Sequence, residues 1–497
     1  MPGFYLPFAQ KPDPAANARL QALARALLND PLPGVSDVVP GYVNLYVEYG
    51  DGSAEAAVRA WVERHAGAVL EPAPSRRVEV GVRYDGEDLE EVARRTGLSV
   101  AEVVELHSRA TYHVYALGFT PGFAFMGDVD ERLRLPRRAA PRKQVPAHRV
   151  AMAAGQTGVY PLPSPGGWHL LGTALEAVYD PRRAEPFRLQ PGDRVRFRPA
   201  DGPTPPVPER LELLPPEPRH PLLRVEEPGL LDLVVDAGRF RAGRFGLARS
   251  GPLDPRSARL ANALVGNPPG TPLLELNLTG PVFSVLRPAV LALAGYGVEA
   301  VLDGEAVPSG QSFAVRPGQT LRFRPTPQGV RAYLAAAGGL ESGRFLGSAS
   351  VDLRGLVGRA LRAGDVLGVA EPRAVRPGFR HPQPELPPRP RVRLLPGPQF
   401  SREALEALCA RALEVGTADR MGMRLAARHE VPGGEVVSEA TPLGAVQVPP
   451  GGQPIVLLND RGTLGGYAKP ALVHPADLPH LAQLRPGQQL RFVSRER

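Results

Sequence analysis

The chain has 497 residues, enough for three or four domains that each bury their own core, so a single small module is excluded. Proline (58) and glycine (54) are abundant, yet 43% of the residues are hydrophobic, which excludes a disordered chain and indicates a loop-rich, mainly β protein. The net charge of +8 comes from arginines that alternate with acidic residues instead of forming basic tracts, and we therefore expect no nucleic-acid partner.

The start of the chain predicts a small α+β lobe over residues 1–75. Residues 16–28 and 53–67 place apolar side chains at helical spacing, and residues 43–49 alternate as a strand does. After this lobe the sequence changes to short apolar runs separated by PG, SPGG and GD pairs. This punctuation is typical of a β-barrel or sandwich.

A repeated pattern indicates how the rest of the chain is organised. LQPGDRVRFRP (189–199), VRPGQTLRFRP (315–325) and LRPGQQLRFVS (484–494) each join a PG turn to an alternating strand, which predicts three related β units. Two proline-rich stretches predict a linker at 204–224 and a connector at 372–391. The predicted β domains are therefore 76–203, 225–371 and 392–497.

Two motifs resemble functional signatures but predict plain structure. Residues 88–106 have helix-turn-helix spacing, yet the second half carries Glu102 and Glu105 and no basic residue, so we expect a structural helical hairpin. Residues 290–300 contain GxGxxA after an apolar strand. The Asp303-Gly304 turn and Pro308 follow too soon for a nucleotide-binding helix, and we expect a β-hairpin.

Other local features limit the cellular setting and the cofactors. The single cysteine, Cys409, cannot pair within the chain, and there is no CxxC to bind zinc. No leader pattern and no run near the roughly 18 apolar residues of a membrane helix is present, so we expect a cytoplasmic protein with no membrane partner. No lysine lies in a Walker A loop or in a biotin-attachment sequence, so covalent biotin is not expected on this chain.

Polar residues within glycine- and proline-rich turns are the candidates for chemistry. An amide and imidazoles can hold a small amide or carboxylate, and arginine forks bind carboxylate or phosphate bidentately. The first half offers His113, Gln156 and His169. The second half offers Arg249, Ser250, Asp254, Glu275, Asp419, Arg420, Glu439, Gln447, Asp460, Tyr467 and Lys469. Lys469 stands out because the sequence has only two other lysines.

Long segments resemble the KipI/KipA family, also called allophanate hydrolase subunits 1 and 2 and now largely understood as the B and C subunits of 5-oxoprolinase. The resemblance rests on YHVYALGFTPGFAFMG and GQTGVYPLPSPGGWHLLG in a B part, and on GRFGLARSGPLD, GSASVDLRG, DRMGMRL and LLNDRGTLGGYAKP in a C part. It implies both subunits fused in one chain. It also implies a mainly β fold, with a ferredoxin-like N-terminal lobe and cyclophilin-like β-barrels, one in the B part and two in the C part.

The resemblance further implies an ATP- and Mg-dependent hydrolase of cyclic amides. Together with a separate A subunit of the LamB/YcsF family, the B and C parts would open 5-oxo-L-proline to glutamate, by phosphorylating the lactam carbonyl oxygen. The implied catalytic residues are His113, Gln156, His169, Asp254, Glu439 and Lys469. The implied substrate- or nucleotide-binding residues are Arg249, Ser250, Glu275, Asp419, Arg420, Gln447, Asp460 and Tyr467, with carboxylates as magnesium ligands or base.

Three positions depart from the family pattern, and two other functions stay open. Gly462 and Leu464 stand where Gln and Thr are usual, and Arg241 stands where a glycine is common. One alternative is a biotin-dependent carboxyltransferase acting on urea or a related amide. The other is a KipI-like inhibitor of a histidine kinase. The oligomeric state is open, with a homo-oligomer among the expectations.

Overall fold

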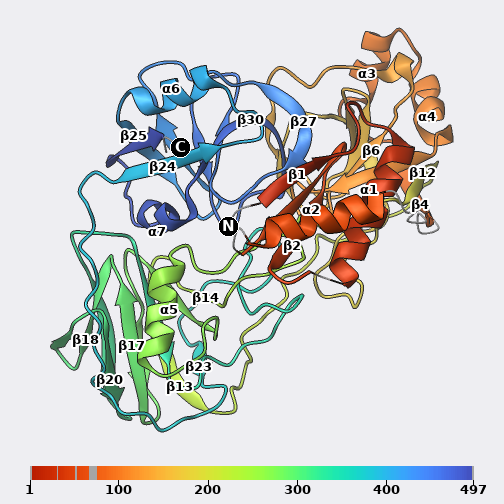
Figure 1. The fold of residues 1–497 in the computed structure, drawn as a ribbon. Helices are drawn as coiled ribbons and strands as arrows, with labels where there is room; N and C mark the ends of the chain where they lie inside the picture. Colours follow the sequence, from red (N-terminus) through yellow and green to blue (C-terminus); the bar gives the residue numbers. More distant parts are fainter. Residues whose placement is uncertain (1–2, 31, 51–52, 67–74, 495–497) are drawn as a thin grey trace.

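The structure is a computed structural model, and it describes residues 3–30, 32–50, 53–66 and 75–494 (Figure 1). The N-terminal lobe is an antiparallel sheet in the order β1-β3-β2, packed against two helices, as predicted. Residue 67, the last of the second predicted helix, lies outside the described residues. The elements are β1 (Gly3–Pro7), α1 (Pro14–Asn29), β2 (Val35–Pro40), β3 (Asn44–Tyr49) and α2 (Ser53–Ala66).

The next unit, called the first barrel, is a closed ring of seven strands in the order β11-β4-β12-β5-β6-β9-β8. Its helices form the predicted hairpin: Gly97 ends the first at φ 72°, and Ser99 begins the second with a capping box to Glu102. The elements are β4 (Arg77–Arg83), α3 (Leu89–Thr96), α4 (Val100–Arg109), β5 (Tyr112–Leu117), β6 (Ala124–Gly127), η1 (Glu131–Leu133), β7 (Arg142–Val145), β8 (Arg149–Ala153), β9 (Gln156–Val159), β10 (Ser164–Gly166), β11 (His169–Ala174) and β12 (Arg194–Pro199).

The third unit, called the two-sheet unit, has a six-stranded sheet, β19-β18-β21-β16-β13-β23, and a five-stranded sheet, β14-β15-β22-β17-β20, around one core. Helix α5 covers the outer face of the second sheet. The elements are β13 (Pro221–Glu227), β14 (Leu233–Val235), α5 (Pro255–Leu264), β15 (Leu273–Asn277), β16 (Val282–Val285), β17 (Ala289–Gly295), β18 (Val298–Leu302), β19 (Glu305–Val307), β20 (Gln311–Val315), β21 (Thr320–Pro325), β22 (Arg331–Ala336) and β23 (Val366–Gly368).

The last unit, called the second barrel, is the sheet β24-β31-β25-β26-β29-β28-β30-β27, which closes because β24 also pairs with β30. Strand β27 extends the ring as an edge beside β30. The elements are β24 (Arg391–Pro396), α6 (Arg402–Ala410), β25 (Leu413–Ala418), β26 (Gly422–Ala426), β27 (Glu435–Ala440), β28 (Ala445–Val448), β29 (Ile455–Leu457), β30 (Leu464–Val473), η2 (Pro475–Asp477), α7 (Leu478–Leu481) and β31 (Gln489–Ser494).

The architecture is mainly β, as the sequence predicts. Two of the three predicted barrels close into seven-strand rings, whereas the unit between them consists of two sheets that share a core. Strand β13 begins at Pro221, inside the segment predicted as a linker, because Leu222 and Leu223 are fully buried there. The β-hairpin expected at 290–300 is wrong, because β17 belongs to the five-stranded sheet and β18 to the six-stranded sheet, and the GxGxxA segment is the corner between them. The Asp303-Gly304 turn instead joins β18 to β19 as a hairpin, and no helix lies in the described stretch between β17 and β22.

The three repeats have the same local structure, which confirms the pattern found in the sequence. In each, the N–H of the residue after glycine donates to the carbonyl of the residue before proline, at 3.1, 3.2 and 3.1 Å. The side chain of that same residue accepts from the N–H of the residue before proline, at 2.8, 2.7 and 2.8 Å. The strand that follows buries its phenylalanine in the core of its own unit: Phe197, Phe323 and Phe492.

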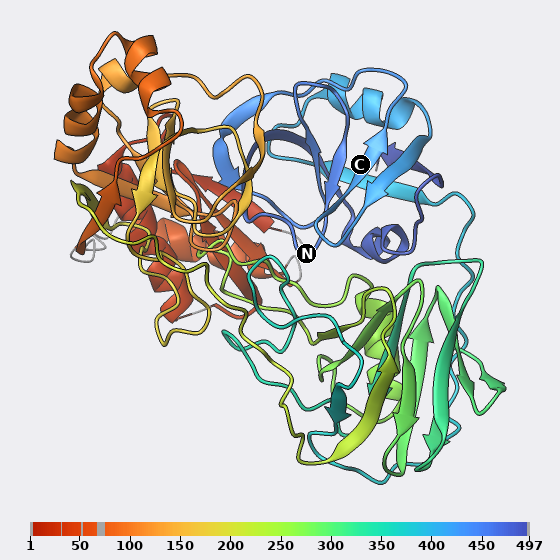
Figure 2. The same cartoon turned by 180° about the vertical axis from the view of Figure 1, so that it is seen from behind.

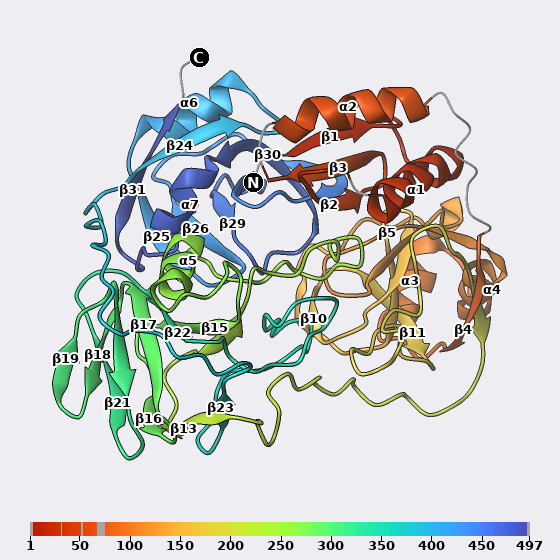
Figure 3. The ribbon, with the colours of Figure 1, turned by 60° about the horizontal axis from the view of Figure 1, so that its bottom comes forward.

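The units pack so that the two barrels lie side by side. Figures 1 and 2 show the first barrel in orange and yellow, the second barrel in blue and the two-sheet unit in green. The N-terminal lobe lies beside the second barrel (Figure 3), where the Tyr5 hydroxyl donates to the carbonyl of Ala440 at 2.6 Å. Within the described ranges, no helix combines the length and the hydropathy needed to cross a bilayer.

Candidate functional site

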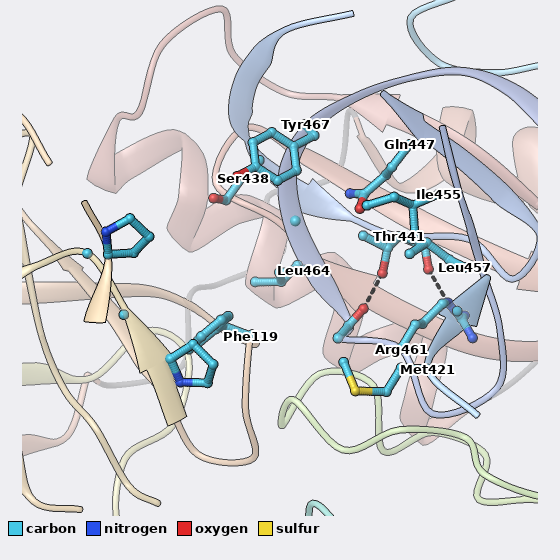
Figure 4. A pocket seen from close by; sticks show the side chains of 18 of the residues that line it. Phe119, Met421, Ser438, Thr441, Gln447, Ile455, Leu457, Arg461, Leu464 and Tyr467 are labelled. Carbon is cyan, nitrogen blue, oxygen red and sulfur yellow. Dashed lines mark hydrogen bonds between the residues drawn. The ribbon is translucent and has the colours of Figure 1, made fainter. Parts of the chain in front are cut away.

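A cleft of about 720 Å³ lies between the two barrels. Its first wall belongs to the first barrel and is aromatic, and its second wall belongs to the second barrel. The aromatic side chains of the first wall are Phe119, Phe123, Phe125, Tyr160 and Trp168. Figure 4 shows Phe119 on one side of the cavity and Gln447, Ile455 and Tyr467 on the other. A cleft of this volume, with apolar and polar groups converging, is typical of a small-molecule site.

The backbone turns that shape the cleft explain why particular residues are found there. Phe119 adopts φ 62°, a left-handed conformation that is rare for a side chain of this size and that orients the loop after β5. Gly118 has no room for a Cβ because Leu464 of the second barrel packs against it. The two walls therefore touch at this point, and the cleft opens beyond it.

Five arginines and two carboxylates line the cleft, so it is electropositive. Three of the arginines are engaged with protein groups: Arg138 with Asp88 (2.9 Å), Arg354 with the carbonyl of Phe119 (3.2 Å), and Arg461 with the carbonyl of Thr441 (2.6 Å). The side chains of Arg137 and Arg424 make no ion pair or hydrogen bond within the described part of the chain. The carboxylates are Asp419 and Glu435. The charge balance favours an anionic ligand.

Three residues predicted from the sequence line this cleft: Asp419, Gln447 and Tyr467. Asp419 is exposed, and its Oδ1 accepts from the backbone N–H groups of Met421 (2.7 Å) and Gly422 (2.9 Å), which leaves its second oxygen available. Gln447 lies on β28 and is 7% exposed. Tyr467 lies on β30 and is half-buried.

Lys469 and Glu439 form a buried ion pair away from the cleft lining. The Lys469 Nζ lies 2.9 Å from the Glu439 Oε1, and the lysine side chain is fully buried. Burial lowers the pKa of Lys469, and the carboxylate of Glu439 opposes that shift. Pairing between β28 and β30 shifts register beside Lys469 and Pro470, a bulge that suits a residue without an N–H.

The predicted residues of the first barrel are positioned outside the cleft. The Nε2 of His113 donates to Asn17 at 2.9 Å and so joins β5 to α1, and burial lowers the pKa of His113 to about 4. The Nε2 of His169 donates to the carbonyl of Pro136 at 2.9 Å. Gln156 is half-buried at the start of β9. Neither histidine lines the cleft, and both connect elements of the fold.

Arg249 belongs to a buried cluster between the N-terminal lobe and the second barrel. Its guanidinium pairs with Glu48 and stacks over Phe240 at 4.6 Å. Burial would raise the pKa of Glu48, but Arg249 and Arg461 together outweigh burial and lower that pKa. Burial raises the pKa of the neighbouring Asp37 to about 6. Ser250, next in the chain, is fully buried at φ 54°.

The remaining predicted residues hold the two-sheet unit to the second barrel. Arg420 donates to Glu275 at 2.5 Å and to Asp460 at 2.8 Å, and all three are buried. Burial alone would lower the pKa of Arg420, but the negative charges of Asp460 and Glu275 outweigh burial and raise that pKa. Asp254 caps α5 and accepts from Gln483 at 2.9 Å. This network lies outside the cleft lining.

Sequence reasoning did not select Arg137, Arg424 or the apolar Ile455 of the cleft. The signal for Arg424 is the alternation in DRMGMRL, because Met423 and Leu425 fill the barrel core and leave Arg424 outside. The two departures at Gly462 and Leu464 do line the cleft. Arg241 has φ 61°, which explains why a glycine suits that position.

No group of three or more His, Cys, Asp and Glu side chains within metal-binding reach is found among the described residues. Magnesium that enters with nucleotide phosphates needs only one or two protein carboxylates. Asp419 and Glu435 are the carboxylates of the cleft that fit this requirement.

Comparison with known proteins finds two matches to one family. The carboxyltransferase domain matches by its subdomains C and D over residues 3–189, and by its subdomains A and B over residues 245–494. The first range contains the aromatic wall of the cleft, and the second contains the opposite wall.

Several individual proteins are similar to the chain. The C subunit of 5-oxoprolinase from Escherichia coli (strain K12) is 36% identical over 55% of this chain and 91% of its own length. The B subunit of 5-oxoprolinase from Bacillus subtilis (strain 168) is 36% identical over 32% of this chain and 73% of its own length. The urea amidolyase of Saccharomyces cerevisiae is 31% identical over 54% of this chain, but that is only 16% of the amidolyase.

A solved structure matches nearly the whole chain. The crystal structure of TTHA0988 is 59% identical and superposes with a TM-score of 0.96, covering 99% of this chain and all of that one. The arrangement of the two barrels around the cleft is therefore shared with a chain of closely similar length and the same order of domains.

Proposed function

Because this chain belongs to the carboxyltransferase-domain family and carries both halves of it in one polypeptide, we propose that it combines the B and C subunits of an ATP-dependent 5-oxoprolinase. Its relatives bear the names of those two subunits. The observation that carries the proposal is the cleft, since each half of the chain contributes one wall of it. A site divided in this way explains why two separate subunits would have to act together.

The proposed reaction opens the lactam of 5-oxo-L-proline to glutamate. An unstrained lactam is a poor electrophile, and water alone does not supply a leaving group. When bound, ATP supplies the phosphoryl group that turns the lactam oxygen into a leaving group. A separate A subunit is the expected partner for ring opening.

The lining of the cleft fits the nucleotide. Arg137 is exposed on the aromatic wall and has no protein partner within the described residues, so its guanidinium is available for phosphate. Phe119 is half-buried on the same wall, where a base can pack against its ring. Asp419 and Glu435 are placed to contact magnesium carried by the phosphates. The residues of the chain would hold the nucleotide phosphates beside the substrate and keep bulk water away from the lactam.

The test is phosphate release from Mg-ATP by the purified chain, with 5-oxoproline present or absent and with or without the cognate A subunit. We expect release that requires both the lactam and the A subunit. Arg137→Gln should raise the KM for ATP, whereas Arg196→Gln, an exposed arginine of β12 away from the cleft, should not. Absence of release when the A subunit is folded and bound would overturn the proposal.

A biotin-dependent carboxyltransferase is the second candidate, favoured by the similarity to urea amidolyase and by the family's name. This function would use a carboxybiotin carried by another protein and an amide as acceptor. Transfer of labelled carboxylate from a carboxybiotinylated carrier to urea, without ATP, would support it. Lactam-dependent phosphate release with no such transfer would exclude it.

A further inference from the structure

A row of three side chains crosses neighbouring strands on the outer face of the second barrel. Arg424 of β26 is paired with Ile455 of β29, and Ile455 is paired with Gln447 of β28. Paired residues of antiparallel strands have their side chains on the same face of the sheet. Because neighbouring strands lie about 5 Å apart, the backbones of Arg424 and Gln447, two strands apart, are separated by about 10 Å. All three residues line the cleft, and Figure 4 shows Gln447 beside Ile455.

The two polar ends of the row have no protein partner within the described ranges. Gln447 is 7% exposed and lines the cleft, and its side chain makes no hydrogen bond to a described residue, so its amide can bond to a ligand there. Arg424 is exposed on the cleft side, because its neighbours Met423 and Leu425 are held in the barrel core. Both groups are therefore available to a ligand, and the strand register fixes where they stand.

The chemical order of the row is cation, aliphatic group, amide. A guanidinium binds a carboxylate through two parallel hydrogen bonds. A primary amide offers both a donor and an acceptor, which complements the C=O and N–H of a lactam. Ile455, between them, is suited to pack against methylene groups. A five-membered lactam with a ring carboxylate carries one group for each member of the row: a carboxylate, ring methylenes and an amide edge.

We propose that Arg424, Ile455 and Gln447 form the recognition site for a cyclic amide that bears a carboxylate, with Arg424 on the carboxylate and Gln447 on the lactam. This inference rests on the proposed function and specifies which residues select the substrate. Gly465 contributes by leaving room for the amide, since a Cβ there would lie 2.7 Å from the Gln447 Nε2.

Calorimetric titration tests the assignment with three ligands. The full chain is titrated in the presence of the A subunit and of a non-hydrolysable ATP analogue. The ligands are 5-oxoproline, 2-pyrrolidinone (no carboxylate) and cyclopentanecarboxylate (no amide). Arg424→Gln should raise the Kd for 5-oxoproline about 10- to 100-fold and leave 2-pyrrolidinone unchanged. Gln447→Leu should weaken both lactams about 3- to 10-fold and leave cyclopentanecarboxylate unchanged. Arg428→Gln, an exposed arginine that does not line the cleft, is the matched control.

Each outcome separates this inference from the function on which it rests. Equal affinity for 5-oxoproline in the wild type, Arg424→Gln and Arg428→Gln would overturn the recognition site and leave the 5-oxoprolinase proposal standing. Absence of both 5-oxoproline binding and phosphate release in the wild type would overturn the function, and the recognition site with it. If Gln447→Leu fails to fold by thermal unfolding, the charge-specific effect of Arg424→Gln decides the question.

Discussion

Replacing Lys469 by methionine distinguishes a structural lysine from a catalytic one. Lys469 is fully buried, and its ammonium lies 2.9 Å from Glu439. Methionine keeps the length of the side chain and removes its charge, so the variant leaves a buried carboxylate without its counter-charge. Two amides would still donate to that carboxylate, from Asn44 at 2.7 Å and from Gln399 at 2.7 Å.

The structure sets the size of the expected effect. Removing one member of a buried ion pair costs about 3–5 kcal/mol, and the two remaining amide donors place Lys469→Met near the lower end, at about 3 kcal/mol. In a cooperative unit of roughly 150–250 residues, this loss lowers the Tm by about 6–12 °C. Lys469→Met combined with Glu439→Gln removes both charges and should recover most of the loss.

Thermal unfolding and phosphate release in the presence of the A subunit together provide the assay, with Lys143→Met, at an exposed position, as the control. We expect Lys469→Met to unfold at a lower temperature and to retain turnover under conditions where it is still folded. An unchanged Tm together with a loss of phosphate release of about 100-fold or more would refute the reasoning. Such a result would make Lys469 a residue that contacts the substrate.

Three further predictions follow from individual residues. Gly465→Ala should displace the Gln447 amide and lower kcat/KM about 3- to 10-fold with the Tm nearly unchanged, and an unchanged kcat/KM would contradict it. Burial raises the pKa of Asp232 to about 7, above its unfolded value near 4, so the free energy of unfolding should fall as the pH rises from about 4 to 7. Denaturant unfolding should show a weaker pH dependence for Asp232→Asn, and the same pH dependence in the variant and the wild type would contradict the assignment. Because burial lowers the pKa of His113 to about 4, His113→Asn should leave the pH profile of kcat/KM between pH 5 and 8 unaltered, whereas the loss of an ionisation there would identify His113 as a general base.

Local patterns predicted local structure well, because turns and strands depend on neighbouring residues. The three PG repeats form the same turn and the same buried phenylalanine strand. The helical hairpin at 88–106 and the Asp303-Gly304 turn between β18 and β19 also follow from residues within a few positions of each other, whereas the crossing of 290–300 from one sheet to the other does not. The resemblance added the two-part organisation, which the family matches confirm.

Local patterns did not predict which charged residues share a site. Arg420 and Glu275 are 145 positions apart in the chain, yet they meet in one buried network. Lys469 lies on β30 and Glu439 on β27, 30 positions apart in the chain, and they meet only in the folded sheet. A glycine-rich turn around a charged residue is equally compatible with a buried pair and with an open cleft, so the sequence does not separate the two.

By itself, the sequence determined the mainly β class, the repeated turn-and-strand unit, the helical hairpin and the fusion of two family halves. Only the tertiary structure decided that the cleft lies between the two barrels, that Arg137 and Arg424 are the cleft arginines without protein partners among the described residues, and that Arg424, Ile455 and Gln447 stand in one row. The physical reason is that turns and hydrophobic periodicity are short-range properties. The burial and pairing of a charge depend on strands that are distant in the chain and adjacent only in the folded protein.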